Sequence, residues 1–225
     1  MSSGTASQTE NPQARRWTAR DVAQMILFAL LIKPFMTLFI GLRVRGREHL
    51  PKREQFILVA NHSSHLDTAS LLTLFSLTRL RRIRPVAAAD YFERNALISL
   101  LTKTLFNILP IARRGITAEN NPVEQMRQAL AAGDSLIIFP EGTRGSGAEI
   151  GPFRSGIAHL LAKQPDVPVI PAYLVNMGRS LPKGEIIPLP FFCEIRLGPP
   201  MRLSGGKQEI VRALEAAVRG LKEIE

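Results

Sequence analysis

At residues 55–67 the chain reads QFILVANHSSHLD, an apolar run followed directly by two histidines, two serines and an aspartate. The run Gln55–Ala60 has the length and continuous hydrophobicity of a strand buried on both faces. The next apolar segment, residues 68–77, is predicted to be a helix. Active sites of open α/β sheets collect where strands end. The polar stretch between these two elements is therefore the first candidate site.

The alternation of strand and helix continues outward from this segment. Asn121 and Pro122 provide an N-cap and a first helical residue, and Gly133 closes the helix that they begin. Apolar side chains repeat at helical spacing from Ile210 to Leu221. Further strands are predicted at Ser135–Phe139, Val169–Val175 and Phe192–Leu197. The pattern predicts an α/β fold with a mainly parallel central sheet flanked by helices.

Composition narrows the class of protein. The chain has 225 residues, 45% of them hydrophobic, and a formal net charge of +10, yet its mean hydropathy is +0.05. A disordered protein that coats nucleic acid would be basic but poor in apolar residues. Cys193 is the only cysteine, which excludes a disulfide scaffold and a cysteine-based zinc site. The composition therefore fits a folded protein that binds an anionic partner. No recognised nucleic-acid motif is present, so we expect no nucleic-acid partner.

The most hydrophobic stretch is residues 22–42, VAQMILFALLIKPFMTLFIGL, which is about as long as a membrane-spanning helix. Lys33 and Pro34 at its centre disfavour a span, because a charge is costly there and proline interrupts a helix. We expect an apolar helical hairpin that dips into one leaflet; a true span and a pair of core-packing helices stay open. Arginines flank both ends, which predicts the cytoplasmic face of the inner or plasma membrane. These are Arg15, Arg16, Arg20, Arg43, Arg45 and Arg47.

His62 and Asp67 in the polar stretch form a candidate acid–base pair. A turn followed by a helical start can fold the carboxylate back toward the imidazole and fix its tautomer. The second ring nitrogen is then free to accept a proton from a hydroxyl. The alternative is a structural histidine, and a zinc site built with His65 is a weaker idea.

Two further segments carry candidate binding residues. The stretch 139–144 (FPEGTR) follows a predicted strand, and its glycine, hydroxyl and guanidinium suit a phosphate, although a turn with a solvated arginine is equally compatible. Arg113 and Arg114 follow an apolar segment, as in an ordinary solvated loop. The cluster at residues 79–84 (RLRRIR) is either a solvated turn or a contact for lipid headgroups or an acidic carrier protein.

Taken together, these segments resemble the glycerolipid acyltransferase family that includes the 1-acylglycerol-3-phosphate acyltransferases. Four family blocks occur in the family's order between residues 61 and 171. They are Asn61-His62 with Asp67, Ile111-Ala112-Arg113, Phe139 to Arg144, and Val169-Ile170-Pro171. Phe153-Arg154-Ser155-Gly156 is similar to the family's Phe-Lys-x-Gly element, and Gly145 replaces the usual serine.

The resemblance implies a function and a set of roles. His62 would be the general base and Asp67 its orienting partner, while Arg113, Glu141, Gly142, Thr143 and Arg144 would hold the phosphate of the acceptor. A fatty acyl group would pass from acyl-CoA or acyl-carrier protein to a lysophospholipid, with 1-acyl-sn-glycerol-3-phosphate as the expected acceptor and phosphatidic acid as the product. No metal or cofactor is expected, because the thioester is already activated.

The resemblance also implies a glycerol-3-phosphate acyltransferase-like fold and a division of the chain. We expect a disordered polar tail over residues 1–20, a membrane-associated helical segment over 21–45 and the acyltransferase domain over 46–225. Two other functions stay open. A hydrolase would use Ser63 or Ser64 as nucleophile, although no Gly-x-Ser-x-Gly elbow is present. A non-catalytic protein that docks on anionic membranes would leave the blocks unexplained.

Overall fold

The structure is a computed structural model that describes residues 16–89, 105–145, 149–182, 185 and 187–223. Its centre is a seven-stranded sheet in the order β1-β7-β6-β2-β5-β3-β4. All neighbouring strands are parallel except β6 and β7. The strands are β1 (Arg43–Arg45), β2 (Ile57–Ala60), β3 (Ile83–Ala88), β4 (Leu109–Ile111), β5 (Ser135–Ile138), β6 (Val169–Val175) and β7 (Glu194–Leu197). The predicted α/β class with a mainly parallel sheet is confirmed.

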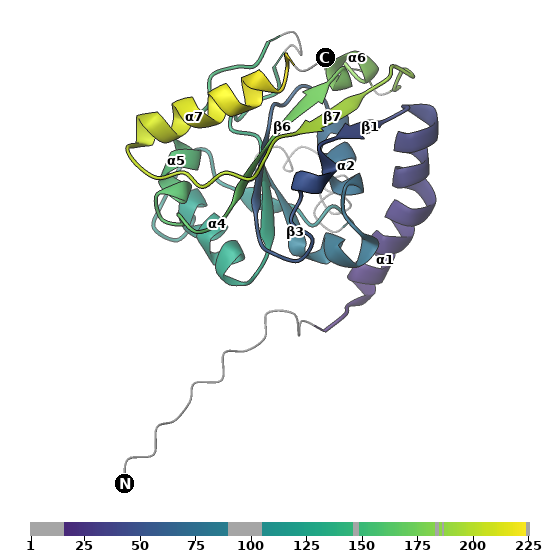
Figure 1. The fold of residues 1–225 in the computed structure, drawn as a ribbon. Coiled ribbons are helices and arrows are strands. Elements are labelled where there is room, and N and C mark those ends of the chain that lie inside the picture. The colour runs from purple at the N-terminus through teal and green to yellow at the C-terminus, as the bar shows by residue number, and fades with distance from the viewer. Residues whose placement is uncertain (1–15, 90–104, 146–148, 183–184, 186, 224–225) are drawn as a thin grey trace.

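Helices cover both faces of this sheet (Figure 1). The helices α4, α5 and α7 lie on one face, and α1 and α2 lie on the other. The α-helices are α1 (Ala19–Leu27), α2 (Leu66–Thr73), α4 (Pro122–Ala131), α5 (Gly156–Leu161), α6 (Met177–Ser180) and α7 (Lys207–Gly220). The shorter helical turns are η1 (Phe28–Ile32), η2 (Phe35–Phe39), η3 (Arg47–His49) and η4 (Leu77–Arg82).

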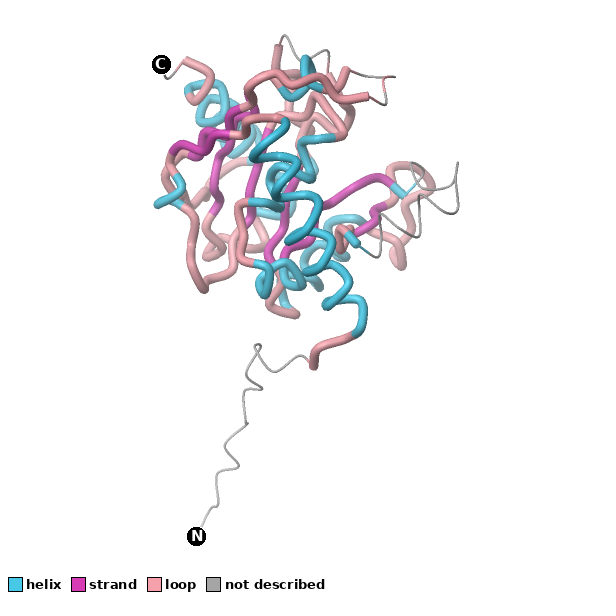
Figure 2. The backbone as a smooth tube through the Cα atoms, turned by 90° about the vertical axis from the view of Figure 1, so that its right-hand side faces the viewer, coloured by secondary structure: helices cyan, strands magenta, loops and turns pink. Residues whose placement is uncertain are grey.

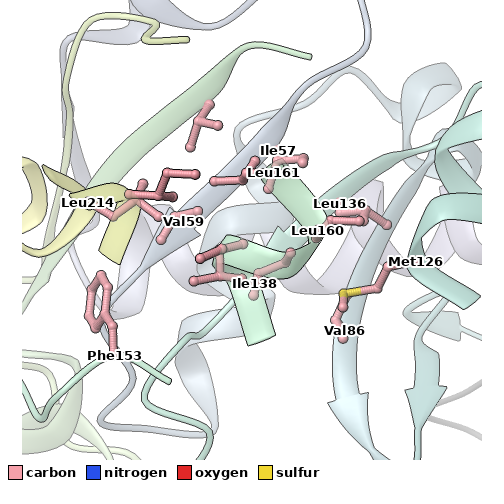
Figure 3. Packing of buried hydrophobic residues seen from close by; sticks show 14 of the residues in the cluster. Ile57, Val59, Val86, Met126, Leu136, Ile138, Phe153, Leu160, Leu161 and Leu214 are labelled. Atoms are coloured by element: carbon pink, nitrogen blue, oxygen red, sulfur yellow. The ribbon is translucent and has the colours of Figure 1, made fainter. Parts of the chain in front are cut away.

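A buried apolar cluster on each face holds the layers together. Figure 3 shows the first cluster, in which Val59 of β2 and Ile138 of β5 pack against Leu160 of α5 and Leu214 of α7. Strands β2 and β5 are buried along their whole length, as their continuous hydrophobicity predicts. Burial of an aliphatic side chain contributes about 1.5–3 kcal/mol, so this cluster fixes the strand ends that carry the polar segments.

The helix α4 confirms the end signals read from the sequence. The Asn121 side chain accepts hydrogen bonds from the backbone N–H groups of Val123 and Glu124, and Pro122 is the first helical residue. Gly133 follows the helix with φ +82°, a left-handed conformation that glycine adopts without strain. The limits of α4 could be predicted from the sequence because helix capping requires only neighbouring residues.

The expected N-terminal hairpin is wrong in one respect, because the apolar segment forms one continuous helix over Ala19–Phe39. Pro34 does not break this helix, because wider π-helical turns form on either side of it. The Lys33 N–H donates to Phe28 O and the Ile40 N–H donates to Phe35 O, both five residues back. These π-helical turns accommodate the proline without a break.

This helix buries Phe28 and Met36 together with two polar side chains, and it exposes other apolar side chains. Asp21 and Gln24 are buried, and Lys33 donates from Nζ to Phe75 O at 2.8 Å. Leu30 and Leu38 on the outer side are 76% and 84% exposed. Figure 2 shows the helix lying along the outside of the domain. By length and composition, Ala19–Phe39 is apolar enough to cross a bilayer.

The arginine cluster at residues 79–84 is neither a solvated turn nor a free headgroup site. The Arg79 guanidinium lies 5.1 Å from the ring centroid of Phe56 and donates to Pro51 O. Arg82 and Arg84 approach Asp134 at 3.4 and 3.8 Å. The segment instead forms part of η4 and the first residues of β3, and its guanidinium groups connect these elements to the neighbouring turns.

Several element limits differ from those predicted. The helix after the polar stretch begins at Leu66 and ends at Thr73 rather than spanning 68–77. The strands β1, β3 and β4 were not predicted, because arginine or proline interrupts their apolar pattern. Most of the expected disordered tail lies outside the described residues, so the three-part division of the chain stays a prediction.

Candidate active site

The loop between β2 and α2 brings His62 and Asp67 together. Asp67 lies in the first turn of α2, and its N–H donates to Ser64 O at 3.3 Å. The Asp67 side chain is fully buried, and its Oδ2 accepts hydrogen bonds from the N–H groups of Ser63 and Ser64 at 2.6 and 2.8 Å. These bonds hold the carboxylate inside the loop and direct the same oxygen toward His62.

The His62 imidazole is fixed on two sides. Its Nδ1 lies 2.8 Å from Asp67 Oδ2, and its ring stacks on Phe139 with centroids 4.3 Å apart. Because the carboxylate accepts the Nδ1 proton, Nε2 is the unprotonated nitrogen of the neutral ring. His62 lines the cavity described below and its side chain is 22% exposed, so a proton can be transferred there. This is the arrangement of a general base with its orienting partner.

The second motif reaches the same place because β2 and β5 are parallel neighbours. Each strand ends at the same edge of the sheet, so Asn61–Asp67 and Phe139–Arg144 lie side by side. Glu141 connects them: its carboxylate accepts from His62 N at 2.7 Å and from Gly151 N at 2.8 Å. Burial raises the pKa of this carboxyl group, against the lowering effect of the two backbone donors.

Glu141 therefore differs from the expectation that it holds a phosphate. Both of its oxygens accept backbone hydrogen bonds, and a carboxylate repels a phosphate dianion. The residue fixes the backbone of His62 instead. The Gly145 N–H adds a further contact, donating to His62 O at 2.9 Å. A Cβ at Gly145 would meet atoms only at ordinary contact distance, so the serine usual in the family would fit there.

Three guanidinium groups gather beside the histidine. Arg113, Arg144 and Arg154 all line the same cavity. Arg113 donates to Gly142 O, and Arg154 donates from Nε to Glu141 O at 3.1 Å. In the part of the chain that the structure describes, Nη1 of Arg144 is buried without a hydrogen-bond partner. Such a group suits an anionic ligand, because leaving it unpaired is costly.

Arg154 is a site residue that the predicted set omits. Its side chain lies over Gly142, whose φ is +73°, and a Cβ at that glycine would come within 2.6 Å of Arg154 Nε. The glycine is thus required both for the turn and for the approach of the guanidinium. The Phe-Arg-Ser-Gly element at residues 153–156 was the sequence signal that pointed to it. Thr143 also lines the cavity.

The cavity extends from His62 into the apolar interior and has a volume of about 640 Å³. It runs between the ends of β3 to β5 and the helix α4. Its inner walls are apolar and its polar groups gather around His62. The apolar walls are formed mainly by Val86, Ala88, Ile108, Ile111, Met126 and Ile138. Such a space suits a hydrocarbon chain bound next to a reacting polar group.

The serines of the loop are engaged in structural contacts. Ser64 Oγ donates to Leu181 O at 2.9 Å and accepts from the Leu66 N–H. Ser63 is 5% exposed and its backbone holds Asp67. Neither arrangement resembles a nucleophile that faces a substrate. His65 lines the cavity, and its pKa is lowered by burial, by Arg144 and by His62. No cluster of three or more possible metal ligands occurs among the described residues.

Comparison with known proteins gives the family. The Acyltransferase family matches residues 41–175, a range that contains the histidine loop and both cavity-lining segments described above. The chain therefore belongs to the acyltransferase family. This acyltransferase has about 60% of its length inside the matched range, and the match confirms the resemblance seen in the four sequence blocks.

Relatives and a solved structure agree with this assignment. The acyltransferase is 29% identical to mouse 1-acyl-sn-glycerol-3-phosphate acyltransferase alpha over 203 residues, which are 89% of this chain and 69% of the mouse protein. It is 31% identical to a probable 1-acyl-sn-glycerol-3-phosphate acyltransferase of Mycoplasma pneumoniae, over 62% of this chain and 51% of that protein. Its fold matches PlsC, the 1-acyl-sn-glycerophosphate acyltransferase of Thermotoga maritima, with a TM-score of 0.70 and 22% identity, covering 92% and 83% of the two chains.

Proposed function

We propose that this acyltransferase transfers a fatty acyl group from acyl-CoA or acyl-carrier protein to the free hydroxyl of 1-acyl-sn-glycerol-3-phosphate, which gives phosphatidic acid. The observation that carries the proposal is the His62–Asp67 pair, which opens onto an apolar cavity lined by three guanidinium groups. The names of the relatives support the same acceptor. A lysophospholipid has a hydroxyl group that suits His62, a phosphate that suits the guanidinium groups and a hydrocarbon chain that suits the apolar cavity.

In the proposed reaction His62 acts on the acceptor hydroxyl. Nε2 removes the hydroxyl proton as the oxygen attacks the thioester carbonyl carbon, and Asp67 stabilises the imidazolium that forms. The tetrahedral intermediate collapses with cleavage of the carbon–sulfur bond. The thiolate of the donor then takes the proton back from the imidazolium, so the histidine is regenerated. A thioester is activated enough to need no metal, and we expect none.

The guanidinium groups would hold the phosphate of the acceptor. Arg144 has an unpartnered buried nitrogen, and Arg113 and Arg154 lie against the Glu141–Gly142 backbone and line the cavity. A guanidinium binds a phosphate through paired donors, which fixes the orientation of the glycerol backbone. The hydroxyl would thereby be held near His62, while an acyl chain occupies the apolar cavity.

We further propose that the enzyme works on the surface of a membrane, on its cytoplasmic face. The support is the helix Ala19–Phe39, which packs one side on the domain and leaves apolar side chains such as Leu30, Leu31 and Leu38 exposed. An apolar outer face of this kind suits a helix that lies in the lipid interface rather than one that spans it. The lipid acceptor would then reach the site from the same bilayer.

The test is transfer of a labelled acyl group to 1-acyl-sn-glycerol-3-phosphate by the full chain. We expect the His62→Ala variant to lose activity by about 10³-fold or more, as removal of a general base does elsewhere. The matched control is His159→Ala, because His159 lies in α5 away from the cavity. Wild-type activity in the His62 variant would refute the mechanism. Free fatty acid without a diacyl product would indicate a hydrolase instead.

The donor is identified in the same assay. Acyl-CoA and acyl-carrier protein are supplied separately, each with a panel of lysophospholipids that differ in headgroup. Phosphomonoester acceptors are expected to react best, because three guanidinium groups favour a dianion over a zwitterionic headgroup. Equal rates with lysophosphatidylcholine would contradict the proposed phosphate site.

A further inference from the structure

The segment 187–192 (IPLPFF) presents apolar side chains to solvent, and none of its residues lines the cavity. Ile187 and Phe192 are 72% and 73% exposed, Leu189 is 48% exposed and Phe191 is 37% exposed. The segment precedes β7, next to the edge strand β1. Grouped exposed side chains of this size in a soluble protein mark a surface that contacts a partner or a membrane.

The backbone of this segment is anchored, so the exposure is built into the fold. The Leu189 N–H donates to Ser180 O at 2.7 Å, and Ser180 Oγ donates back to Leu189 O at 2.6 Å. Asn176 donates from Nδ2 to Phe192 O at 3.1 Å. Ser180 itself is fully buried. The apolar side chains therefore extend outward from a fixed base.

The segment adjoins the end of the N-terminal apolar helix. Arg43 N donates to Cys193 O at 2.9 Å, and the ring of Phe192 lies against Gly41, where a Cβ would come within 2.7 Å of Cδ1. Leu38 and Phe39 of the last helical turn are 84% and 46% exposed. The helix and the segment 187–192 meet at this corner of the domain, near the upper end of the N-terminal helix in Figure 1, where η2 leads to β1. Together they make one apolar surface.

Arginines border this surface. The Arg43 guanidinium lies 5.8 Å from the ring centroid of Phe192, and that of Arg179 lies 5.0 Å from the ring of Phe191. Within the described ranges, neither arginine forms an ion pair with a carboxylate. An aromatic ring beside a guanidinium fits the boundary between acyl chains and anionic headgroups. This charge pattern favours an anionic lipid surface over a second protein.

We propose that the segment 187–192 is a second membrane contact, which inserts Phe192 and Ile187 into an anionic leaflet beside the N-terminal helix. The proposal rests on the membrane association proposed above and adds a contact from the opposite end of the chain. Two contacts, one from a helix and one from a loop about 150 residues later, hold the domain in a defined orientation on the bilayer. A single helical anchor would leave it free to rotate about the helix axis.

Vesicle binding by the full chain tests this proposal. We expect Phe192→Ser and Ile187→Ser each to weaken partitioning by about tenfold on vesicles of phosphatidylcholine mixed with phosphatidylglycerol, because each removes an apolar side chain that the bilayer would bury. Arg43→Gln should weaken binding by about fivefold on these anionic vesicles and little on phosphatidylcholine alone. The matched control is Ile116→Ser, which removes a side chain that is 55% exposed after β4, at the opposite edge of the sheet.

A direct probe is tryptophan fluorescence. Trp17 is the only tryptophan of the chain, so a Trp17→Phe, Phe192→Trp variant reports on position 192 alone. A blue shift on anionic vesicles and quenching by brominated acyl chains are expected. Emission unchanged by vesicles that bind the protein, together with wild-type partitioning of the two serine variants, would overturn the proposal.

The outcomes separate this proposal from the proposed function. Activity of the same variants on a short-chain, water-soluble acceptor is expected to equal that of the wild type, because the segment lies outside the cavity. Loss of vesicle binding with retained activity on the soluble acceptor supports the second contact. Binding by the serine variants as strong as that of the wild type refutes the second contact and leaves the acyl transfer standing.

Discussion

Glu141 connects two segments of the site through its carboxylate. One carboxylate oxygen holds the backbone of His62 and the other holds Gly151, ten residues further along the chain. The ring of His62 is oriented separately, by Asp67 and Phe139. The backbone and the side chain of His62 are therefore fixed by different residues, which keeps Nε2 in one position relative to the cavity.

A Glu141→Gln variant should show this division. The amide has one acceptor, so one backbone N–H faces an NH₂ donor and loses its partner at a cost of about 1–3 kcal/mol. The displaced His62 should lower kcat/KM by about 10²-fold, as small misplacements of catalytic groups do. Thermal unfolding and acyl-transfer kinetics measure the two effects. Glu149→Gln is the matched control, since Glu149 is exposed nearby; an unchanged rate in the Glu141 variant would show that the two bonds are dispensable.

At the scale of elements, each site segment depends on the strand or helix next to it. The apolar strands β2 and β5 place their two polar segments at one edge of the sheet. The helix α4 closes the cavity through Met126, which packs in the first core cluster. The N-terminal helix packs on the domain through Phe28 and Met36, which are buried in the apolar cluster of that face, and Lys33 donates to Phe75 O. The side that meets the protein therefore carries both apolar and polar residues.

The cap of α4 gives a test at this scale. We expect Asn121→Ala to lower the free energy of unfolding by about 1 kcal/mol, because two backbone N–H groups lose their acceptor. Asn121→Asp retains a capping oxygen and should restore most of the stability. Chemical denaturation of both variants measures the difference. Equal stability of the alanine variant and the wild type would mean that packing of Met126, and not the cap, sets the start of the helix.

The whole molecule combines an acyl-transfer site at one region of the sheet with an apolar surface at another. The arginines that contribute to its net charge of +10 have several different roles. Arg113, Arg144 and Arg154 line the cavity, while Arg43 and Arg179 border the apolar surface. The basic cluster at residues 79–84 bonds internally and serves the fold. A single electrostatic role for the excess charge is therefore excluded.

Metal removal gives a prediction for the whole enzyme. No group of three or more metal-binding side chains occurs in the described part of the chain, and the proposed chemistry requires only His62 as base. Acyl transfer should therefore continue at an unchanged rate after exhaustive dialysis against a chelator. Loss of activity that returns on addition of Mg²⁺ or Zn²⁺ would contradict the proposed mechanism.

The sequence alone determined the class of fold, the strands β2, β5 and β6, the limits of α4 and the contact between His62 and Asp67. Each of these depends on short-range patterns: continuous apolar runs, capping residues, and a histidine five residues from its carboxylate. Only the tertiary structure decided that Glu141 holds His62, that Arg154 joins the site, and that the N-terminal segment is one helix beside Phe192. These contacts join residues from 13 to about 150 positions apart. They form because parallel strand pairing brings distant segments to the same edge, and no local pattern encodes which segments will meet.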